Sequence, residues 1–208
     1  HTTVFKQDDP SDNSSVFHVF ERLNTSGVRL QPQEIRNCIF YGELINLLDR
    51  LNDNEDWRAI YGRKNDRLKD RELILRFLAF YYLRSAYRRP MKEFLNNFTA
   101  AHRNPSLDEC KSYEAVFSSA IHLARTALQE RAFRPERLIN AAVFDSVMVG
   151  LAKRLDKGEV KNIQGVSAAY EKLIDNENYK NAYLRSTADE ESVAARMRLA
   201  IEAFSVCE

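Results

Sequence analysis

The sequence is poor in the residues that make tight turns. It contains six glycines and five prolines among 208 residues, which is less than half of their usual combined share of roughly 12%. A sandwich or barrel of many short strands needs a turn about every ten residues. The scarcity of turn-forming residues therefore argues against such folds. It favours long helices with few connections, in a chain long enough to bury a substantial core.

The chain also lacks an excess of either charge and a long apolar run. Its 31 basic and 30 acidic residues nearly cancel, so it has no overall positive charge of the kind that attracts nucleic acids or anionic membranes. No run of about 18 apolar residues would span a bilayer. No signal peptide is visible at the N-terminus, which also lacks a methionine. We expect a cytoplasmic protein without a membrane partner.

Residues that bind metals or act as nucleophiles are sparse and scattered. The three cysteines are an odd number at wide spacings, which predicts reduced thiols rather than a disulfide framework. No two histidines stand at ligand spacing with an acidic or cysteine partner. The sequence has no Walker-type phosphate loop, no Gly-x-Ser-x-Gly elbow and no His-Asn-His nuclease signature. We therefore predict no metal site, no catalytic residue and no cofactor held by this chain alone.

Apolar residues recur at three- and four-residue steps over most of the chain, which is the period of helices with one buried face. We predict an all-α fold, with one domain of seven to ten helices over residues 14–208. Residues 1–13 are less regular and include a possible strand remnant at 2–5. Pro32 is well placed in the first turn of a helix, because its missing N–H has no partner there in any case.

Several helix boundaries can be predicted from capping residues. Asn54 is suited to cap a short helix, and Ser106 a long one. We expect Asp70 to cap a helix that continues to about Arg88 and, being apolar on most sides, lies in the centre of the core. Pro135 is predicted to start another helix with Leu138 facing inward. Residues 160–176 and about 189–206 form two further predicted helices.

One polar segment, residues 20–37, joins the end of one predicted helix to the start of the next. It contains three arginines, two asparagines, a Thr-Ser pair and a glycine. As an anion site, its backbone N–H groups and a helix N-terminus would face a phosphate, with Arg22 or Arg36 binding the oxygens. As a purely structural joint, Asn24 would bond the backbone and Arg22 would pair with Glu34. Spacing alone leaves both interpretations open.

A basic stretch provides a second candidate, a contact with nucleic acid. Its cationic residues are Arg63, Lys64, Arg67 and Lys69, followed by Arg71 and later by Arg84, Arg88 and Arg89. The alternative is a solvated connection, because Asp66, Asp70 and Glu72 alternate with these cations.

Residues 20–27, followed by Leu30 and by Glu34-Ile35-Arg36-Asn37, resemble a hallmark of the GmrSD-type family, whose N-terminal module is called domain of unknown function 262. The family pattern is a Phe, three residues, an Asn and then a Gly, followed by a Leu and an acidic-Ile-Arg-Asn helix start. Phe20, Asn24 and Gly27 match it. Further stretches that resemble the family are 54–58, 69–77, 137–148 and 186–196, so that the resemblance covers nearly the whole chain.

The resemblance implies that the chain is the helical second part of a larger module. The family's module begins with a ParB/sulfiredoxin-like fold carrying an Asp-Gly-Gln-Gln-Arg motif, linked to nucleotide binding and hydrolysis, and that motif is absent here. Residues 1–13 would be the tail of that upstream part. Many members continue into an HNH-type nuclease half, which is also absent.

Such proteins act in bacterial restriction of modified DNA and in phage defence, with hydrolysis of a nucleoside triphosphate gating DNA cleavage. The resemblance thus implies an upstream ParB-like domain, DNA and a nuclease domain or subunit as partners, and a nucleotide with a divalent cation as ligands of the longer protein. This chain alone is expected not to be an enzyme. The candidate nucleotide-binding residues, which combine the family match with side-chain chemistry, are Phe20, Arg22, Asn24, Thr25, Gly27, Arg36 and Asn37. Two other classes of function remain open, a non-catalytic module that binds proteins and a helical domain that contacts DNA.

Overall fold

The computed structural model describes residues 30–207, and within this range the chain is one all-helical domain without strands, as predicted. Its α-helices are α2 (Pro32–Ile39), α3 (Glu43–Asn52), α4 (Glu55–Tyr61), α5 (Lys69–Leu83), α6 (Met91–Ala101), α7 (Leu107–Leu128), α8 (Ala141–Leu155), α9 (Ile163–Asp175), α10 (Glu177–Leu184) and α11 (Glu190–Ser205). Two short 3₁₀ turns, Arg84–Ala86 and Gln129–Arg131, follow α5 and α7. The strand remnant and the helix predicted before residue 24 lie outside the described range.

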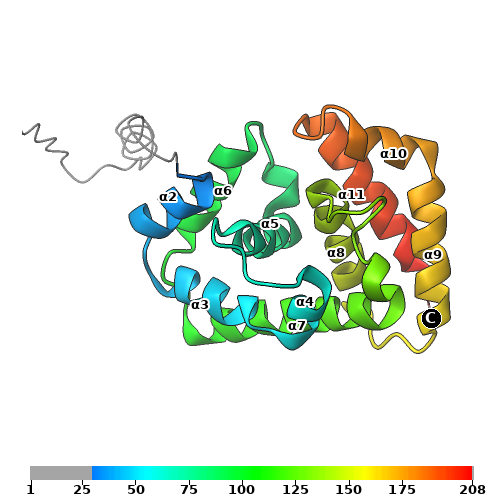
Figure 1. Cartoon of the computed structure of the whole chain (residues 1–208), viewed down its shortest axis with the longest axis horizontal. Coiled ribbons are helices and arrows are strands. Elements are labelled where there is room, and N and C mark those ends of the chain that lie inside the picture. The colour runs from blue at the N-terminus through cyan, green and yellow to red at the C-terminus, as the bar shows by residue number, and fades with distance from the viewer. Residues whose placement is uncertain (1–29, 208) are drawn as a thin grey trace, which may run out of the picture.

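Helices α5 and α8 form the centre of the domain. In Figure 1, α2, α3 and α6 lie at one end, α9, α10 and α11 at the other, and the long helix α7 runs along one side of both. Helix α8 packs against α5, α7 and α11, while α5 also packs against α3 and α6. The two central helices therefore join the two ends of the molecule.

The composition of α5 and α8 explains their central position. Most of α5 is buried, including Leu73, Ile74, Phe77 and Phe80, so the prediction that this helix is central is confirmed. Helix α8 is buried continuously over residues 142–152. At Gly150, an added Cβ would lie 2.8 Å from a backbone carbonyl oxygen of α11. A glycine is needed there because the two helices approach so closely.

Three of the predicted boundaries are confirmed. Pro32 is the first residue of α2, and a break at Gly42 separates α2 from α3. Asn54 caps α4, where its side chain accepts a hydrogen bond from the backbone N–H of Trp57. Ser106 caps α7 by accepting from the N–H of Glu109, whose carboxylate accepts in return from the Ser106 N–H. This reciprocal pair is a capping box.

The prediction that Asp70 caps α5 is wrong. Helix α5 begins at Lys69, and its N-cap position is Leu68, two residues before Asp70, with a positive φ of 57°. Asp70 is fully buried, and its Oδ2 lies 3.1 Å from both the backbone nitrogen of Asn65 and the guanidinium of Arg58. The carboxylate therefore fastens the preceding loop and α4 to α5 instead of closing the helix end.

The helix predicted from Pro135 begins six residues later. Asn140 caps α8 through hydrogen bonds from the N–H groups of Ala142 and Val143, and residues 132–140 form an irregular loop. Leu138, predicted to face inward, is 83% exposed. A separate helix, α10, also lies between the two predicted C-terminal helices.

The three cysteines, Cys38, Cys110 and Cys207, are free thiols, in agreement with the prediction from their number. Among the residues that the structure describes, no helix combines the length and the apolar character needed to cross a membrane.

Candidate anion-binding cleft

A cleft of about 680 Å³ opens where the start of α2, the start of α5 and the loop before α8 meet. Its lining residues are Gln31, Pro32, Tyr61, Arg67, Lys69, Glu72, Leu73, Arg76, Arg134, Arg137, Leu138, Ile139 and Ala141. Five of these side chains are cationic and one is acidic, in a chain whose charges otherwise nearly cancel. The cleft therefore concentrates positive charge that the composition alone does not reveal.

Two of the five cations have carboxylate partners. The Nη2 atom of Arg67 lies 3.0 Å from Oε2 of Glu34, which also accepts a hydrogen bond from the backbone N–H of Gln31 at the start of α2. Arg76 binds Asp145 through two nitrogens, with its Nε atom 3.0 Å from Oδ1 and its Nη2 atom 2.5 Å from Oδ2. These ion pairs fix the walls of the cleft.

The acidic residue of the cleft, Glu72, forms an ion pair with Arg36, which is buried beneath the cleft wall. Its Oε2 atom accepts a hydrogen bond from Nη1 of Arg36 at 3.1 Å, and the Arg36 side chain is only 1% exposed. Burial lowers the pKa of Arg36, although the Glu72 carboxylate opposes this change. Glu72 therefore does not cancel the charge of the cations that face the cleft.

Arg134 is fixed in place by uncharged hydrogen-bond partners. Its Nη2 atom donates to the carbonyl oxygen of Ile60 at 2.7 Å, and its Nη1 atom donates to the carbonyls of Glu130 and Ala132, both at 3.3 Å. Backbone carbonyls orient a guanidinium but carry no negative charge to offset it. The full positive charge of Arg134 is therefore available to a ligand.

Lys69 and Arg137 are the most accessible cations of the cleft. Both side chains are exposed, and the charged group of neither has a hydrogen-bond or ion-pair partner anywhere in the described structure. Arg134 and Arg137 come from the loop over residues 132–140, whereas Lys69 is the first residue of α5. Three cations thus face the cleft without a carboxylate partner, and guanidinium groups suit the oxygens of phosphates.

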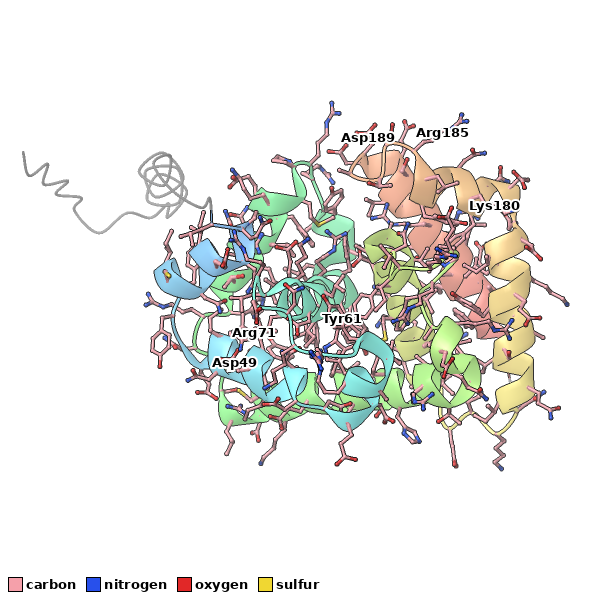
Figure 2. All side chains as sticks on the ribbon, in the orientation of Figure 1. Asp49, Tyr61, Arg71, Lys180, Arg185 and Asp189 are labelled. Atoms are coloured by element: carbon pink, nitrogen blue, oxygen red, sulfur yellow. The ribbon has the colours of Figure 1, made fainter. Side chains whose placement is uncertain are left out.

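An apolar wall lies beside these cations. It consists of Tyr61, Leu73, Leu138, Ile139 and Ala141. Tyr61 lies near the centre of the view in Figure 2 and is half-buried. Burial raises the pKa of its hydroxyl, so the ring carries no charge at neutral pH. The cleft therefore has room for an anion with an attached apolar or aromatic group.

The predicted nucleotide-binding residues fall partly beyond the described range. Phe20, Arg22, Asn24, Thr25 and Gly27 lie outside it, and their role stays a prediction.

Two further predicted nucleotide-binding residues, Arg36 and Asn37, are part of α2. Arg36 donates to Gln33, Glu72 and the side-chain oxygen of Asn96, so it packs behind the wall of the cleft. Asn37 accepts a hydrogen bond from the Gln33 amide at 3.0 Å. The structure thus brings Arg36 next to the cleft through its partner Glu72.

The predicted nucleic-acid contact residues have different surroundings. Lys64 pairs with Asp53, and Arg67 pairs with Glu34. Figure 2 shows Arg71, which also belongs to this stretch, beside Asp49, and the Nε atom of Arg71 lies 2.7 Å from Oδ1 of Asp49. Lys69 lines the cleft, and Arg63 is exposed on the loop before α5. Most of this stretch is therefore neutralised by neighbouring acids.

Sequence reasoning did not select Arg76, Arg134 or Arg137 as site residues. The sequence does contain a signal for Arg76. This arginine lies within the apolar run from Leu73 to Phe80, and Asp145 lies within the apolar α8, so both are charged residues at positions where a buried core is expected. Such charges need a partner. Nothing in the local sequence separates Arg134 and Arg137 from ordinary surface arginines.

The described residues contain no group of three or more His, Cys, Asp or Glu side chains that would hold a metal ion. His102 and His122 each have one polar partner, the hydroxyl of Tyr113 and the carboxylate of Asp56 respectively.

Comparisons with known proteins give no match: no family model, no curated protein and no solved structure matches this chain. The function is therefore inferred from the chain's own residues and from the sequence pattern of residues 20–37.

Proposed function

We propose that this chain is the helical portion of a nucleotide-dependent protein of the GmrSD type, which acts in modification-dependent restriction and phage defence. In this proposal the cleft binds the phosphates of the nucleotide. The observation that carries it is the grouping of Lys69, Arg134 and Arg137 around one cleft, each without a carboxylate partner in the described structure.

The position of the cleft connects it with the segment that resembles the family. Gln31 and Pro32, at the start of α2, line the cleft, and they directly follow the stretch that contains Asn24 and Gly27. Backbone N–H groups of a loop can bind the oxygens of a phosphate. We propose that residues 20–37 complete the nucleotide site in this way.

The residues of the cleft suit binding better than catalysis. Arginine and lysine side chains neutralise and orient phosphate oxygens, but no described side chain in the cleft is an unpaired carboxylate or a histidine that would activate water. The hydrolytic residues would therefore come from the upstream ParB-like part, with a divalent cation. This chain alone would bind a nucleotide and hydrolyse little of it.

Calorimetric titration of the 208-residue chain with ATP, GTP and tripolyphosphate tests the binding site. We expect binding that is lost when both Arg134 and Arg137 are replaced by alanine. Lys64→Ala is the matched control, because Lys64 is an exposed cation that pairs with Asp53 away from the cleft lining. Equal binding by wild type and the double variant would contradict the assignment.

The segment 20–37 is tested in the longer protein by its nucleoside triphosphatase activity. Asn24→Ala and Arg22→Ala are each expected to lower that activity and the nucleotide affinity. If the segment is only a structural joint in a protein-binding module, Asn24→Ala will lower the melting temperature and leave nucleotide binding unchanged.

Direct contact with DNA is the second candidate, and one observation favours it: Arg63 and Lys69 are exposed cations on the same loop and helix start. Contacts with phosphates make DNA affinity fall steeply as salt is raised. A DNA affinity that does not depend on salt, or no measurable affinity, would exclude this candidate.

A further inference from the structure

A buried ion cluster lies directly behind the cleft. Asp145 of α8 is fully buried between Arg76 of α5 and Arg196 of α11. Burial alone lowers the pKa of Arg76, but the carboxylate of Asp145 more than offsets this effect, and the pKa is raised. The single carboxylate of Asp145 thus lies beside two guanidinium groups, that of the mostly buried Arg76 and that of the fully buried Arg196, where α8 packs against α5 and α11.

The two arginines bind Asp145 unequally. Arg76 uses Nε and Nη2 in a paired arrangement with both carboxylate oxygens, the most directional form of this interaction. Arg196 approaches only to 3.8 Å through its Nη2 atom, and neither its Nε nor its Nη2 atom has a hydrogen-bond partner. Its remaining nitrogen donates to the carbonyl oxygen of Thr187 at 2.7 Å. Asp145 is therefore bound to Arg76 and only attracted by Arg196.

This arrangement determines which part of Arg76 faces the cleft. Since Nε and Nη2 are both directed at Asp145, Nη1 is the nitrogen that remains for a ligand. Arg76 lines the cleft, and its side chain is 14% exposed. A guanidinium is planar, so binding of one edge by a carboxylate fixes the direction of the other nitrogen.

We infer that Asp145 is a positioning residue of the cleft: it orients Arg76 so that the Nη1 atom faces a bound anion. This inference rests on the proposed function, because it assigns a role within the same cleft. Arg196 lies on the other side of Asp145, with its Nη2 atom 3.8 Å from Oδ2, and makes its own hydrogen bond with the carbonyl oxygen of Thr187. That residue belongs to the loop between α10 and α11, in which Figure 2 labels Arg185 and Asp189.

A double-mutant cycle distinguishes positioning from a general structural role. Tripolyphosphate affinity is measured calorimetrically for the wild-type chain, Asp145→Asn, Arg76→Gln and the double variant. We expect each single variant to bind at least fivefold more weakly, and the double variant to bind no more weakly than Arg76→Gln alone. If the two losses multiply in the double variant, Asp145 does not act through Arg76 and the inference is overturned.

Ser146→Ala is the matched control. Ser146 is the next residue of α8, is fully buried and shares a hydrogen bond of 2.7 Å with the hydroxyl of Tyr179, away from the cleft lining. We expect a lower melting temperature with unchanged tripolyphosphate affinity. A loss of affinity equal to that of Asp145→Asn would mean that any disturbance of α8 weakens binding, which would overturn the specific role of Asp145.

Two further measurements keep the inference testable. If Asp145→Asn does not fold, Arg76→Lys replaces it. A lysine keeps the charge, but its single nitrogen cannot both bind Asp145 as Nε and Nη2 do and face the cleft as Nη1 does. A fivefold loss of affinity is expected, and unchanged affinity would overturn the inference.

If the wild-type chain does not bind tripolyphosphate, the proposed function fails, and nuclear magnetic resonance of the arginine Nε–H groups tests the positioning separately. A slowly exchanging Arg76 Nε–H signal in the wild type supports it, and a rapidly exchanging one overturns it.

Discussion

Two basic regions of this molecule differ in how their charge is used. The stretch over residues 63–71 is conspicuously basic in sequence, yet Lys64, Arg67 and Arg71 each have a carboxylate partner. The loop over residues 132–140 is less conspicuous, yet Arg134 binds only carbonyl oxygens and Arg137 has no partner in the described structure. The full charge of a cation is available to a ligand where the fold leaves that cation without a carboxylate partner, and a count of basic residues does not show this.

The same comparison separates stability from function. Ion pairs in the first region fasten loops to helices, as Asp70 does with Arg58 and the loop before α5. In the second region, Arg134 binds backbone carbonyl oxygens and Arg137 has no partner in the described structure, so neither takes part in an ion pair there. We therefore expect substitutions in the two regions to affect different measurements.

The largest expected effect is on stability, at Asp70. Asp70→Asn removes a fully buried charge that accepts hydrogen bonds from Arg58 and from the Asn65 backbone. Breaking one partner of a buried ion pair costs about 3 kcal/mol or more. Urea unfolding measures this loss. The exposed Glu114, which pairs with Arg50 at 3.3 Å, is the control, and Glu114→Gln is expected to cost less than about 1 kcal/mol.

The next effect is on affinity, at Arg137. Arg137→Ala is expected to weaken tripolyphosphate binding roughly tenfold, since a hydrogen bond to a charged group contributes about 1.5–3 kcal/mol. The unfolding free energy should change by no more than about 0.5 kcal/mol, because the side chain is exposed and unpaired. A stability loss without an affinity loss would reverse the assignment of the two regions.

Salt concentration provides a test without mutation. Raising the ionic strength from about 0.1 M to 1 M shortens the screening length from about 10 Å to about 3 Å. Binding of tripolyphosphate in an open, cationic cleft is expected to weaken over this range. The melting temperature should change little, because the main ion pairs of the protein are buried. Calorimetry and thermal unfolding at both salt concentrations measure the two responses.

The smallest effect is expected at Lys64. Lys64→Ala removes a cation that is exposed and already paired with Asp53, so stability should fall by less than about 1 kcal/mol. Anion affinity should stay within a factor of two of the wild type. A tenfold loss of affinity would place the binding region at the exposed surface around Lys64 instead of the cleft.

Much of the fold follows from the sequence pattern, and the exceptions have physical causes. The apolar residues on most sides of α5 and the capping residues Asn54 and Ser106 are local sequence signals, and the structure confirms the predictions made from them. Asp70 and Pro135 are also typical residues of helix starts, but tertiary contacts decide otherwise. The Asp70 carboxylate accepts hydrogen bonds from Arg58 and from the backbone N–H of Asn65. The start of α8 is set by Asn140, whose side chain caps the helix.

The candidate site is less predictable than the fold because it depends on which charges remain unpaired. Arg36 looks like a ligand-binding arginine in sequence, but in the structure its nitrogens face Gln33, Asn96 and Glu72. Arg134 and Arg137 come together with Lys69 only because the loop before α8 lies against the start of α5. That contact joins residues far apart in the chain, and no local pattern encodes it.

The most direct test of the central claim is a crystal structure of the chain with a non-hydrolysable ATP analogue. The account predicts that the phosphates lie in the cleft, within hydrogen-bond distance of Arg134 and Arg137, with Arg76 still bound to Asp145. Phosphates bound at the exposed surface of residues 63–64, away from the cleft, would contradict it.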